Sequence, residues 1–122
     1  MLVDCHPVPR PAPIDVRTGA GSTQVGQLEY SSEFTQTISN AEATLALLVR
    51  EGLFESQRSV EYRFLIHFAS AAEWEEYFAY WASYYEPLPE RFNQTIEGLA
   101  GTSGAEVVLD TICKITSFKK PG

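Results

Sequence analysis

The most regular pattern of hydrophobic and polar positions lies between residues 58 and 68. Apolar side chains occupy every second position, and the positions between them are mainly polar or charged. The apolar set is Val60, Tyr62, Phe64, Ile66 and Phe68, and the alternate set is Glu61, Arg63, Leu65 and His67. This alternation predicts a β-strand with one apolar face.

Segments near the two ends of the chain also predict strands. Residues 1–5 form a short apolar run, followed by His6 and by four prolines between Pro7 and Pro13. Proline removes a backbone donor and restricts the preceding residue, so we expect a buried strand that ends near Cys5, then an extended segment. Residues 105–118 are rich in β-branched side chains, which predicts a long final strand.

A hairpin is expected between the first strand and the first helix. Candidate strands over residues 14–17 and 25–30 flank a polar stretch that contains glycine. The glycines at 19, 21 and 26 do not match a dinucleotide fingerprint, because Gln24 stands where its third glycine would be, and the sequence has no Gly-Lys-Ser/Thr. The stretch therefore favours a plain turn over a phosphate-binding loop.

Capping boxes predict where two helices begin. Ser39 with Glu42 opens a helix over residues 40–51 that ends at Gly52. Ser70 with Glu73 opens a second helix over residues 71–85, which the prolines at 87 and 89 break. A third helix carries one apolar stripe, ends around residues 98–101 and is followed by a loop over residues 101–104. Its stripe is Leu88, Phe92, Ile96 and Leu99.

These elements predict an α/β or α+β fold. We expect a small mixed sheet of about three to five strands with an antiparallel C-terminal strand, covered by about three helices that include an aromatic-rich insertion. A chain of 122 residues with 44% hydrophobic residues fits a single domain, 1–122. Within it, residues 1–37 hold a strand, the proline-rich excursion and the hairpin, and residues 38–122 hold a helix, a strand, further helices and the last strand.

Charge and cysteine content restrict the partners and the compartment. A net charge of −7 repels nucleic acid and anionic membranes, and no stretch is apolar enough to predict a membrane span. The first residues do not resemble a secretory signal, so we expect a cytoplasmic protein. Cys5 and Cys113 form no metal-binding pattern, and the sequence leaves open whether they meet.

Two histidines could take part in chemistry. His6 follows Asp4 and Cys5, but neighbours along a strand point to opposite faces, which argues against a nucleophilic pair and favours a buried Cys5 with His6 at a ligand's edge. His67 could serve as a general base, or it could be hydrogen-bonded under a covering helix. The second reading is favoured for His67, and no catalytic residue is assigned.

The aromatic helix is the least ordinary feature of the sequence. One ridge consists of Trp74, Phe78, Trp81 and Tyr85, and a neighbouring ridge consists of Tyr77, Tyr80 and Tyr84. Together they are wider than the apolar stripe of a surface helix, so the tyrosine side is expected to line a pocket or to meet another subunit, with core packing as the alternative. The candidates for a substrate pocket are His6, His67, Trp74, Tyr77, Tyr80, Trp81 and Tyr84.

In this order the elements resemble the C-terminal half of a class I S-adenosylmethionine-dependent methyltransferase. Leu-Val-Asp-Cys-His-Pro at residues 2–7 resembles the fifth strand of that family and its exit, and residues 49–54 resemble the end of the last major helix. Residues 58–68 are similar to the sixth strand and residues 106–118 to the antiparallel seventh. Residues 68–92 are similar to helical insertions of some small-molecule methyltransferases.

The resemblance implies the substrate side of such an enzyme. In the family, a glycine-rich loop after the first strand and an acidic residue ending the second strand hold the cofactor, and this sequence contains neither. The resemblance therefore implies that this chain alone binds no cofactor. It implies S-adenosylmethionine binding only if a complementary half supplies the glycine-rich loop, and it implies no catalysis without that half. The excursion after Cys5 and the aromatic insertion would lie over the substrate pocket.

Two other functions compete with this one. The chain could be a non-enzymatic α+β module for small-ligand binding or dimerisation, or it could be a small dimeric enzyme that uses His6 or His67 as a base. The open edge of the expected sheet also predicts a homo-oligomer, or pairing with a complementary cofactor-binding half.

Overall fold

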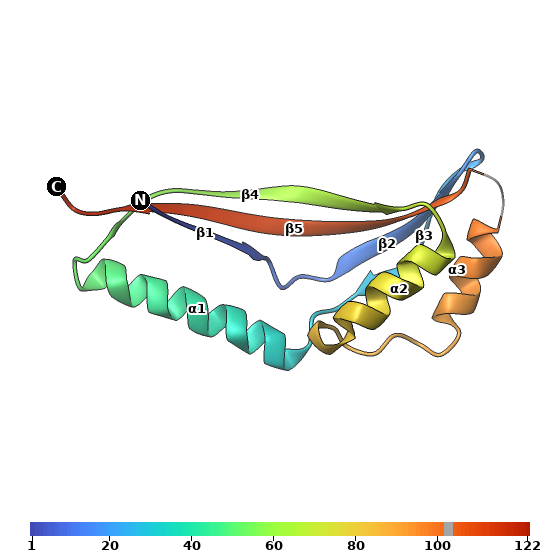
Figure 1. The fold of residues 1–122 in the computed structure, drawn as a ribbon, viewed down its shortest axis with the longest axis horizontal. Helices are drawn as coiled ribbons and strands as arrows, with labels where there is room; N and C mark the ends of the chain where they lie inside the picture. Colours follow the sequence, from blue (N-terminus) through green and yellow to red (C-terminus); the bar gives the residue numbers. More distant parts are fainter. Residues whose placement is uncertain (102–103) are drawn as a thin grey trace.

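The computed structural model describes residues 1–101 and 104–122 (Figure 1). Strands β1 (Leu2–Pro7), β2 (Ala12–Thr18) and β3 (Gly21–Leu28) come first, followed by helix α1 (Ser32–Arg50) and strand β4 (Glu55–Phe68). Helix α2 (Ala71–Trp81), the 3₁₀ helix η1 (Ala82–Tyr84), helix α3 (Phe92–Ala100) and strand β5 (Glu106–Lys119) complete the described elements. The α+β class and the antiparallel last strand agree with the sequence prediction.

Strand β5 is the centre of the sheet. It pairs with β4 from Val107 to Lys119 on one edge, and with β1 and β2 in turn on the other edge. β3 pairs with β2, and every pairing between the described strands is antiparallel. The prolines between β1 and β2 explain why two short strands, rather than one long strand, share this edge of β5, since proline cannot continue a ladder of hydrogen bonds.

The pairing register defines two faces of the sheet, because paired residues share a face and neighbours along a strand alternate. We call the faces A and B. Face A carries Leu109, Cys113 and Ile115 of β5, and face B carries Asp110, Lys114 and Thr116 of the same strand. On β4, the residues paired with the face A set are Ile66, Tyr62 and Val60. The β4 residues paired with the face B set are Leu65, Glu61 and Ser59.

Helices α2 and α3 cover face A at the end of the sheet where β5 begins. Their side chains Trp74, Phe92 and Ile96 pack on Ile14 and Leu109, and Trp74, Ile14, Ile96 and Leu109 are fully buried. β3 comes close to this core at Gly26, where an added Cβ would lie 2.5 Å from Cε2 of Phe92. Glycine at that position therefore lets the phenyl ring lie against the strand.

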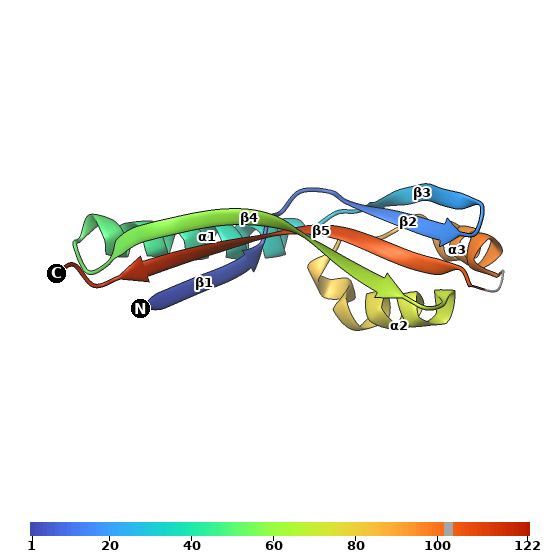
Figure 2. The same cartoon turned by 90° about the horizontal axis from the view of Figure 1, so that it is seen from above.

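Helix α1 lies over face B at the opposite end of the sheet (Figure 2). His6 Nε2 of β1 is 2.8 Å from Glu42 Oε1 of the helix. A cavity of about 360 Å³ separates the helix from Lys114 and Thr116. Of the residues of α1, all of which the structure describes, Ile38 alone is buried. The molecule therefore has a tightly packed half and a loosely packed half, covered on opposite faces.

Several expected boundaries move in the structure. The first helix begins at Ser32 rather than at residue 40, because Ser31 and not Ser39 caps it: Phe34 N–H donates to Ser31 Oγ across 3.1 Å. The second cap is confirmed, since Glu73 N–H donates to Ser70 Oγ across 3.2 Å. Gly52 ends α1 as expected, with a positive φ of 78°. The loop expected over residues 101–104 includes two residues outside the described part.

One burial expectation is wrong, and the apolar face of β4 is only partly covered. The first strand was expected to be buried with Cys5 inside, yet Cys5 is exposed, because α2 and α3 cover only the other half of face A. For the same reason the apolar face of β4 is buried only at its end: Phe68 is buried, whereas Phe64 is 50% exposed. Among the described residues, no helix is both long and apolar enough to cross a membrane.

Candidate functional site

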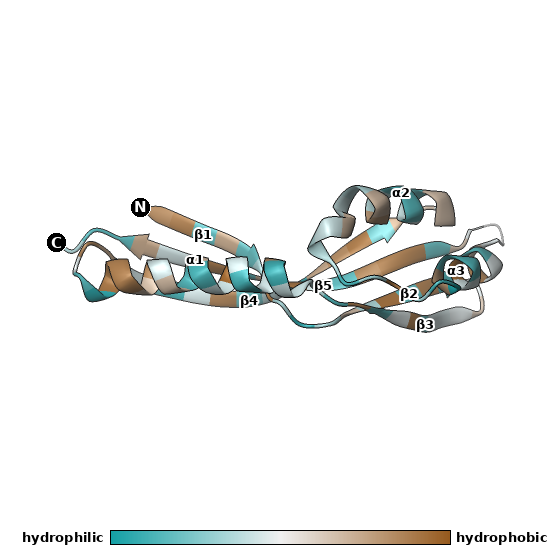
Figure 3. Cartoon of the chain, turned by 90° about the horizontal axis from the view of Figure 1, so that it is seen from below, coloured by the Kyte–Doolittle hydropathy of each residue, from teal (hydrophilic) through white to brown (hydrophobic). Residues whose placement is uncertain are grey.

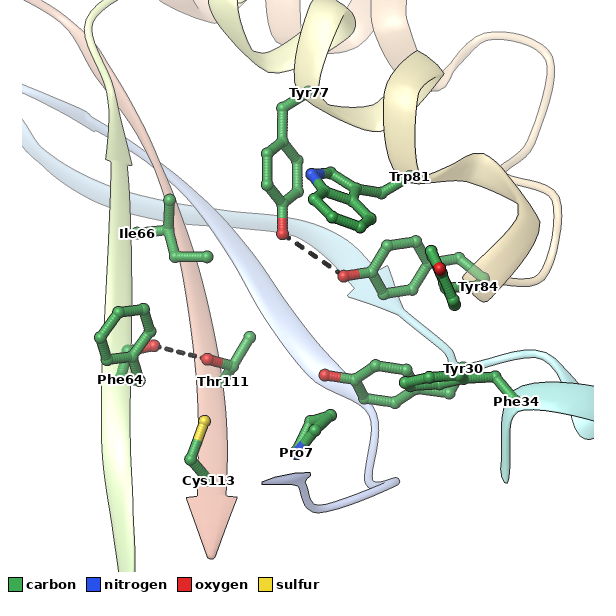
Figure 4. Close-up of a pocket in the computed structure, with 11 residues that line it drawn as sticks. Pro7, Tyr30, Phe34, Phe64, Ile66, Tyr77, Trp81, Tyr84, Thr111 and Cys113 are labelled. Carbon is green, nitrogen blue, oxygen red and sulfur yellow. Dashed lines mark hydrogen bonds between the residues drawn. The ribbon is translucent and has the colours of Figure 1, made fainter. Parts of the chain in front are cut away.

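An apolar cleft of about 420 Å³ lies on face A in the middle of the molecule (Figure 4). β4 and β5 form its floor, α2 and η1 form one wall, and the segment that enters α1 forms another. The carboxyl end of β1 reaches it at Pro7. We call it the aromatic cleft, and its lining is Pro7, Tyr30, Phe34, Phe64, Ile66, Tyr77, Trp81, Tyr84, Tyr85, Thr111 and Cys113.

Backbone hydrogen bonds hold two of these walls together. Ser31 N–H donates to the carbonyl of Tyr84 across 2.9 Å, and Glu86 N–H donates to the carbonyl of Glu29 across 2.8 Å. Tyr30 and Tyr85 form an isolated antiparallel bridge between these two contacts. Segments more than fifty positions apart in the sequence are thus fixed side by side, which places the start of α1 against the end of η1.

The aromatic rings of the cleft contact one another across these segments. The Tyr30 ring lies 5.5 Å from that of Phe34 and 5.2 Å from that of Tyr85, measured between centroids. Phe34 meets Tyr84 edge to face at 4.9 Å, and Trp81 lies 5.5 Å from Tyr84. Such pairs add stability beyond the area they bury, so the rings form a preorganised wall.

The polar atoms of the cleft are uncharged at neutral pH. Burial raises the pKa of Tyr30 to about 12, and burial together with a hydrogen bond between Tyr85 and Tyr77 raises the pKa of Tyr85 above its usual range. Burial also raises the pKa of the Cys113 thiol. Thr111 Oγ1 donates to the carbonyl of Phe64 across 2.7 Å. The tyrosine phenols, the Trp81 indole N–H and the Cys113 thiol are the other hydrogen-bonding groups of the side chains, and the described lining includes no ionised side chain.

The structure brings together three of the residues expected to form a substrate pocket. Tyr77, Trp81 and Tyr84 line the aromatic cleft. Trp74 does not, because it lies in the core, where its Nε1–H donates to Asn93 Oδ1 across 3.4 Å. Tyr80 projects away and is 76% exposed. The tyrosine ridge expected to act as a unit is therefore split between the cleft and the solvent.

Neither histidine belongs to the cleft. Both ring nitrogens of His6 face carboxylates under α1, with Nδ1 2.6 Å from Asp4 Oδ2 and Nε2 2.8 Å from Glu42 Oε1. His67 lies on face B, where Nδ1 is 3.2 Å from Glu106 Oε2. Since the cleft is on face A, neither ring is placed to exchange a proton with a molecule bound there.

Sequence reasoning missed part of the lining. The sequence predicts Tyr30 at the end of a strand and no helix before residue 40, so it does not place Phe34 in the helix. Ser31 offers the same capping chemistry, and apolar residues at 34, 38, 41, 45 and 48 continue the helical stripe from it. That stripe is the signal that would have found Phe34. Phe64 and Ile66 did belong to the predicted apolar face of the strand.

Three comparisons with known proteins found no relative of this chain. A scan against protein-family models, a search of curated proteins and a search of solved structures found no match to the chain. Among the residues that the structure describes, no group of three or more His, Cys, Asp or Glu side chains could hold a metal ion.

Proposed function

We propose that the chain is the substrate-side half of an S-adenosylmethionine-dependent small-molecule methyltransferase, with the aromatic cleft as its acceptor pocket. The strand arrangement carries the proposal: β5 lies antiparallel between β1 and β4, as the seventh strand of the class I family lies between the fifth and sixth. The cofactor-binding half is supplied outside this chain, in the cytoplasm, where Cys5 and Cys113 stay as free thiols.

The position of the cleft supports the same function. In open α/β sheets, ligands bind beyond the carboxyl ends of the strands. β1 and β4 run parallel to each other on either side of β5, and the carboxyl end of β1 at Pro7 lies at the cleft. The two walls come from the excursion after β1 and from the helices inserted after β4, the segments that the resemblance places over the substrate.

The chemistry of the lining favours a neutral, planar acceptor. Apolar and aromatic side chains surround the space, and the phenols of Tyr30 and Tyr85 stay protonated, so they can donate hydrogen bonds to an uncharged oxygen or nitrogen. A carboxylate would lose its hydration without meeting a cation. Methyl transfer requires chiefly in-line positioning of the acceptor and the sulfonium, which rigid walls can provide without a nucleophile of their own.

The first experiment tests ligand binding with 2-naphthol and its anionic counterpart 2-naphthoate, by ligand-observed NMR. We expect 2-naphthol to bind at least about tenfold more tightly, because the anion pays an uncompensated desolvation cost. W81A should weaken 2-naphthol binding by about tenfold or more, since Trp81 lines the cleft. E76A is the control on the same helix and should bind like the unmodified chain, since Glu76 is exposed and lies outside the lining.

A different experiment tests the methyltransferase assignment. Calorimetric titration of this chain with S-adenosylmethionine should give no binding. A candidate partner chain with a glycine-rich strand and loop, co-expressed with it, should co-purify and restore cofactor binding. Submillimolar cofactor affinity of this chain alone would contradict the proposal that the cofactor-binding half is supplied outside this chain. Binding of 2-naphthol that W81A abolishes, with no partner chain found, would favour the second candidate, a free-standing small-ligand module.

The packed half of the molecule favours that second candidate. Trp74, Ile14, Leu28 and Leu109 are fully buried in a core at the end of face A that α2 and α3 cover, and described residues alone fill this core. A chain that keeps this core and unfolds cooperatively by itself would be able to bind ligands as an independent domain.

A further inference from the structure

The outer edge of β4 is open over the whole length of the strand. β4 pairs with β5 on one side, and no strand of the described chain pairs with its other side. Alternate residues of an antiparallel strand direct their backbone groups to opposite sides, so every second residue of this fourteen-residue strand presents an unpaired donor and acceptor along this edge. Exposed edges of this length are templates for pairing with another strand.

The apolar side chains next to this edge are also uncovered. On face A, beyond the part that α2 and α3 bury, Phe64 is 50% exposed, Val60 is 40% exposed and Tyr62 is 37% exposed. They continue the floor of the aromatic cleft toward the free end of the strand, and Figure 3 shows apolar residues along β1 and β4 in this half. Hydrophobic side chains in a row along an open edge mark an interface.

We propose that a second copy of this chain pairs with β4 through an antiparallel β4–β4 contact centred on Tyr62, which joins two sheets into one. A two-fold axis perpendicular to the sheet requires that the residue at the axis face its own copy and that facing residues share a face. Centring on Tyr62 or on Glu61 gives the longest overlap, because these residues stand at the middle of Glu55–Phe68.

Charge selects between these two registers. Centring on Glu61 places two carboxylates opposite each other, which is unfavourable. Centring on Tyr62 places Glu61 of each copy opposite Arg63 of the other, on face B. On face A the same register places Val60 opposite Phe64 twice, with the two Tyr62 rings at the centre. Apolar and oppositely charged cross-strand pairs both stabilise a sheet.

The existing contacts of the two charged residues are compatible with this pairing. Arg63 uses Nε and Nη2 toward Asp110, at 3.2 and 2.6 Å, and its side chain is mostly exposed, so Nη1 can donate to a carboxylate of the second copy. Glu61 accepts from Arg10 Nη2 at 3.2 Å through both oxygens and remains partly exposed. A carboxylate can accept further donors, so the dimer would join two ion pairs into a network.

The test uses charge reversal and sedimentation velocity at micromolar concentrations. The unmodified chain should sediment as a dimer. R63E should weaken the dimer at least about tenfold, because Glu61 of one copy would face a carboxylate at position 63 of the other. E61R should have a similar effect, because the new arginine at position 61 would face Arg63 of the other copy. R58E is the matched control, since the register places Arg58 opposite Ile66 rather than a charge, and it should stay dimeric.

Mixing the two variants gives the decisive result. In an R63E–E61R pair both facing positions again carry opposite charges, so equimolar mixing should restore a dimer from two monomeric variants. Circular dichroism checks that each variant is folded. A monomeric unmodified chain, a dimer that neither reversal weakens, or folded variants that stay monomeric when mixed would each overturn the proposal. Ligand binding in the cleft is measured separately and does not depend on this result.

Discussion

At the scale of the residue, the cleft depends on phenols that keep their protons. Tyr30 and Tyr85 bridge the two wall segments, and burial is the largest cause of the raised pKa of both. An ionised phenolate in this apolar setting would lack a compensating cation. The aromatic cleft therefore keeps its apolar character up to pH values at which free tyrosine is ionised.

This property predicts a late tyrosine titration in the folded protein. The pKa of Tyr30 rises from 10.0 to about 12 on folding, so its protonated form stabilises the fold. That contribution is complete below pH 10 and is lost as the pH rises through about 12. The phenolate absorbance of the folded chain should therefore include a late component that Y30F reduces. A titration that matches the urea-unfolded chain throughout would contradict the assignment.

At the scale of the element, the position of one capping residue decides how α1 reaches the cleft. The sequence predicts Ser39 as the cap because Glu42 completes a capping box with it. In the structure Ser31 is the cap, and Glu42 instead meets His6. Local capping rules do not include the bridge between Tyr30 and Tyr85, a long-range contact that fixes where the chain enters the helix.

The two serines therefore provide a matched pair of variants. S31A should lower the free energy of unfolding by about 1 kcal/mol, because Phe34 N–H would lose its acceptor. S39A should change it by only a few tenths of a kcal/mol, since position 39 is an ordinary exposed helix position. Urea denaturation followed by circular dichroism measures both. Equal losses in the two variants, or a greater loss in S39A, would contradict the capping assignment.

Element types were predictable from the sequence, whereas the faces they bury were not. The alternation from Val60 to Phe68 correctly indicated a strand, and Ser70 correctly indicated the start of α2. Burial of Phe68 but not of Phe64 depends on which end of the sheet α2 covers. That choice follows from tertiary packing around Trp74, which periodicity does not encode. The same limit explains why Tyr77 and Tyr80 could not be separated.

At the scale of the whole molecule, the sheet joins two halves of unequal packing. α2 and α3 enclose a continuous core with Trp74 at its centre, whereas α1 is held over face B by contacts such as that between His6 and Glu42. The cleft lies between the two halves, with Phe34 from one and Tyr77 from the other. A change in the position of α1 would thus change one wall of the cleft and leave the other in place.

Unequal packing predicts unequal local stability. Local opening is least costly where few apolar side chains are buried, so the amides of α1 should exchange with solvent through a low-energy opening, while those of β5 from Val107 to Leu109 should exchange only on global unfolding. Native-state hydrogen exchange of R63E, which lacks the proposed dimer contact, isolates the effect of packing within one chain.

Adding 2-naphthol should then slow exchange in the first turn of α1, because a ligand against Phe34 favours the docked helix. Uniform protection of α1 and β5, or a ligand effect confined to α3, would mean that the two halves unfold as one unit and that the cleft has no movable wall.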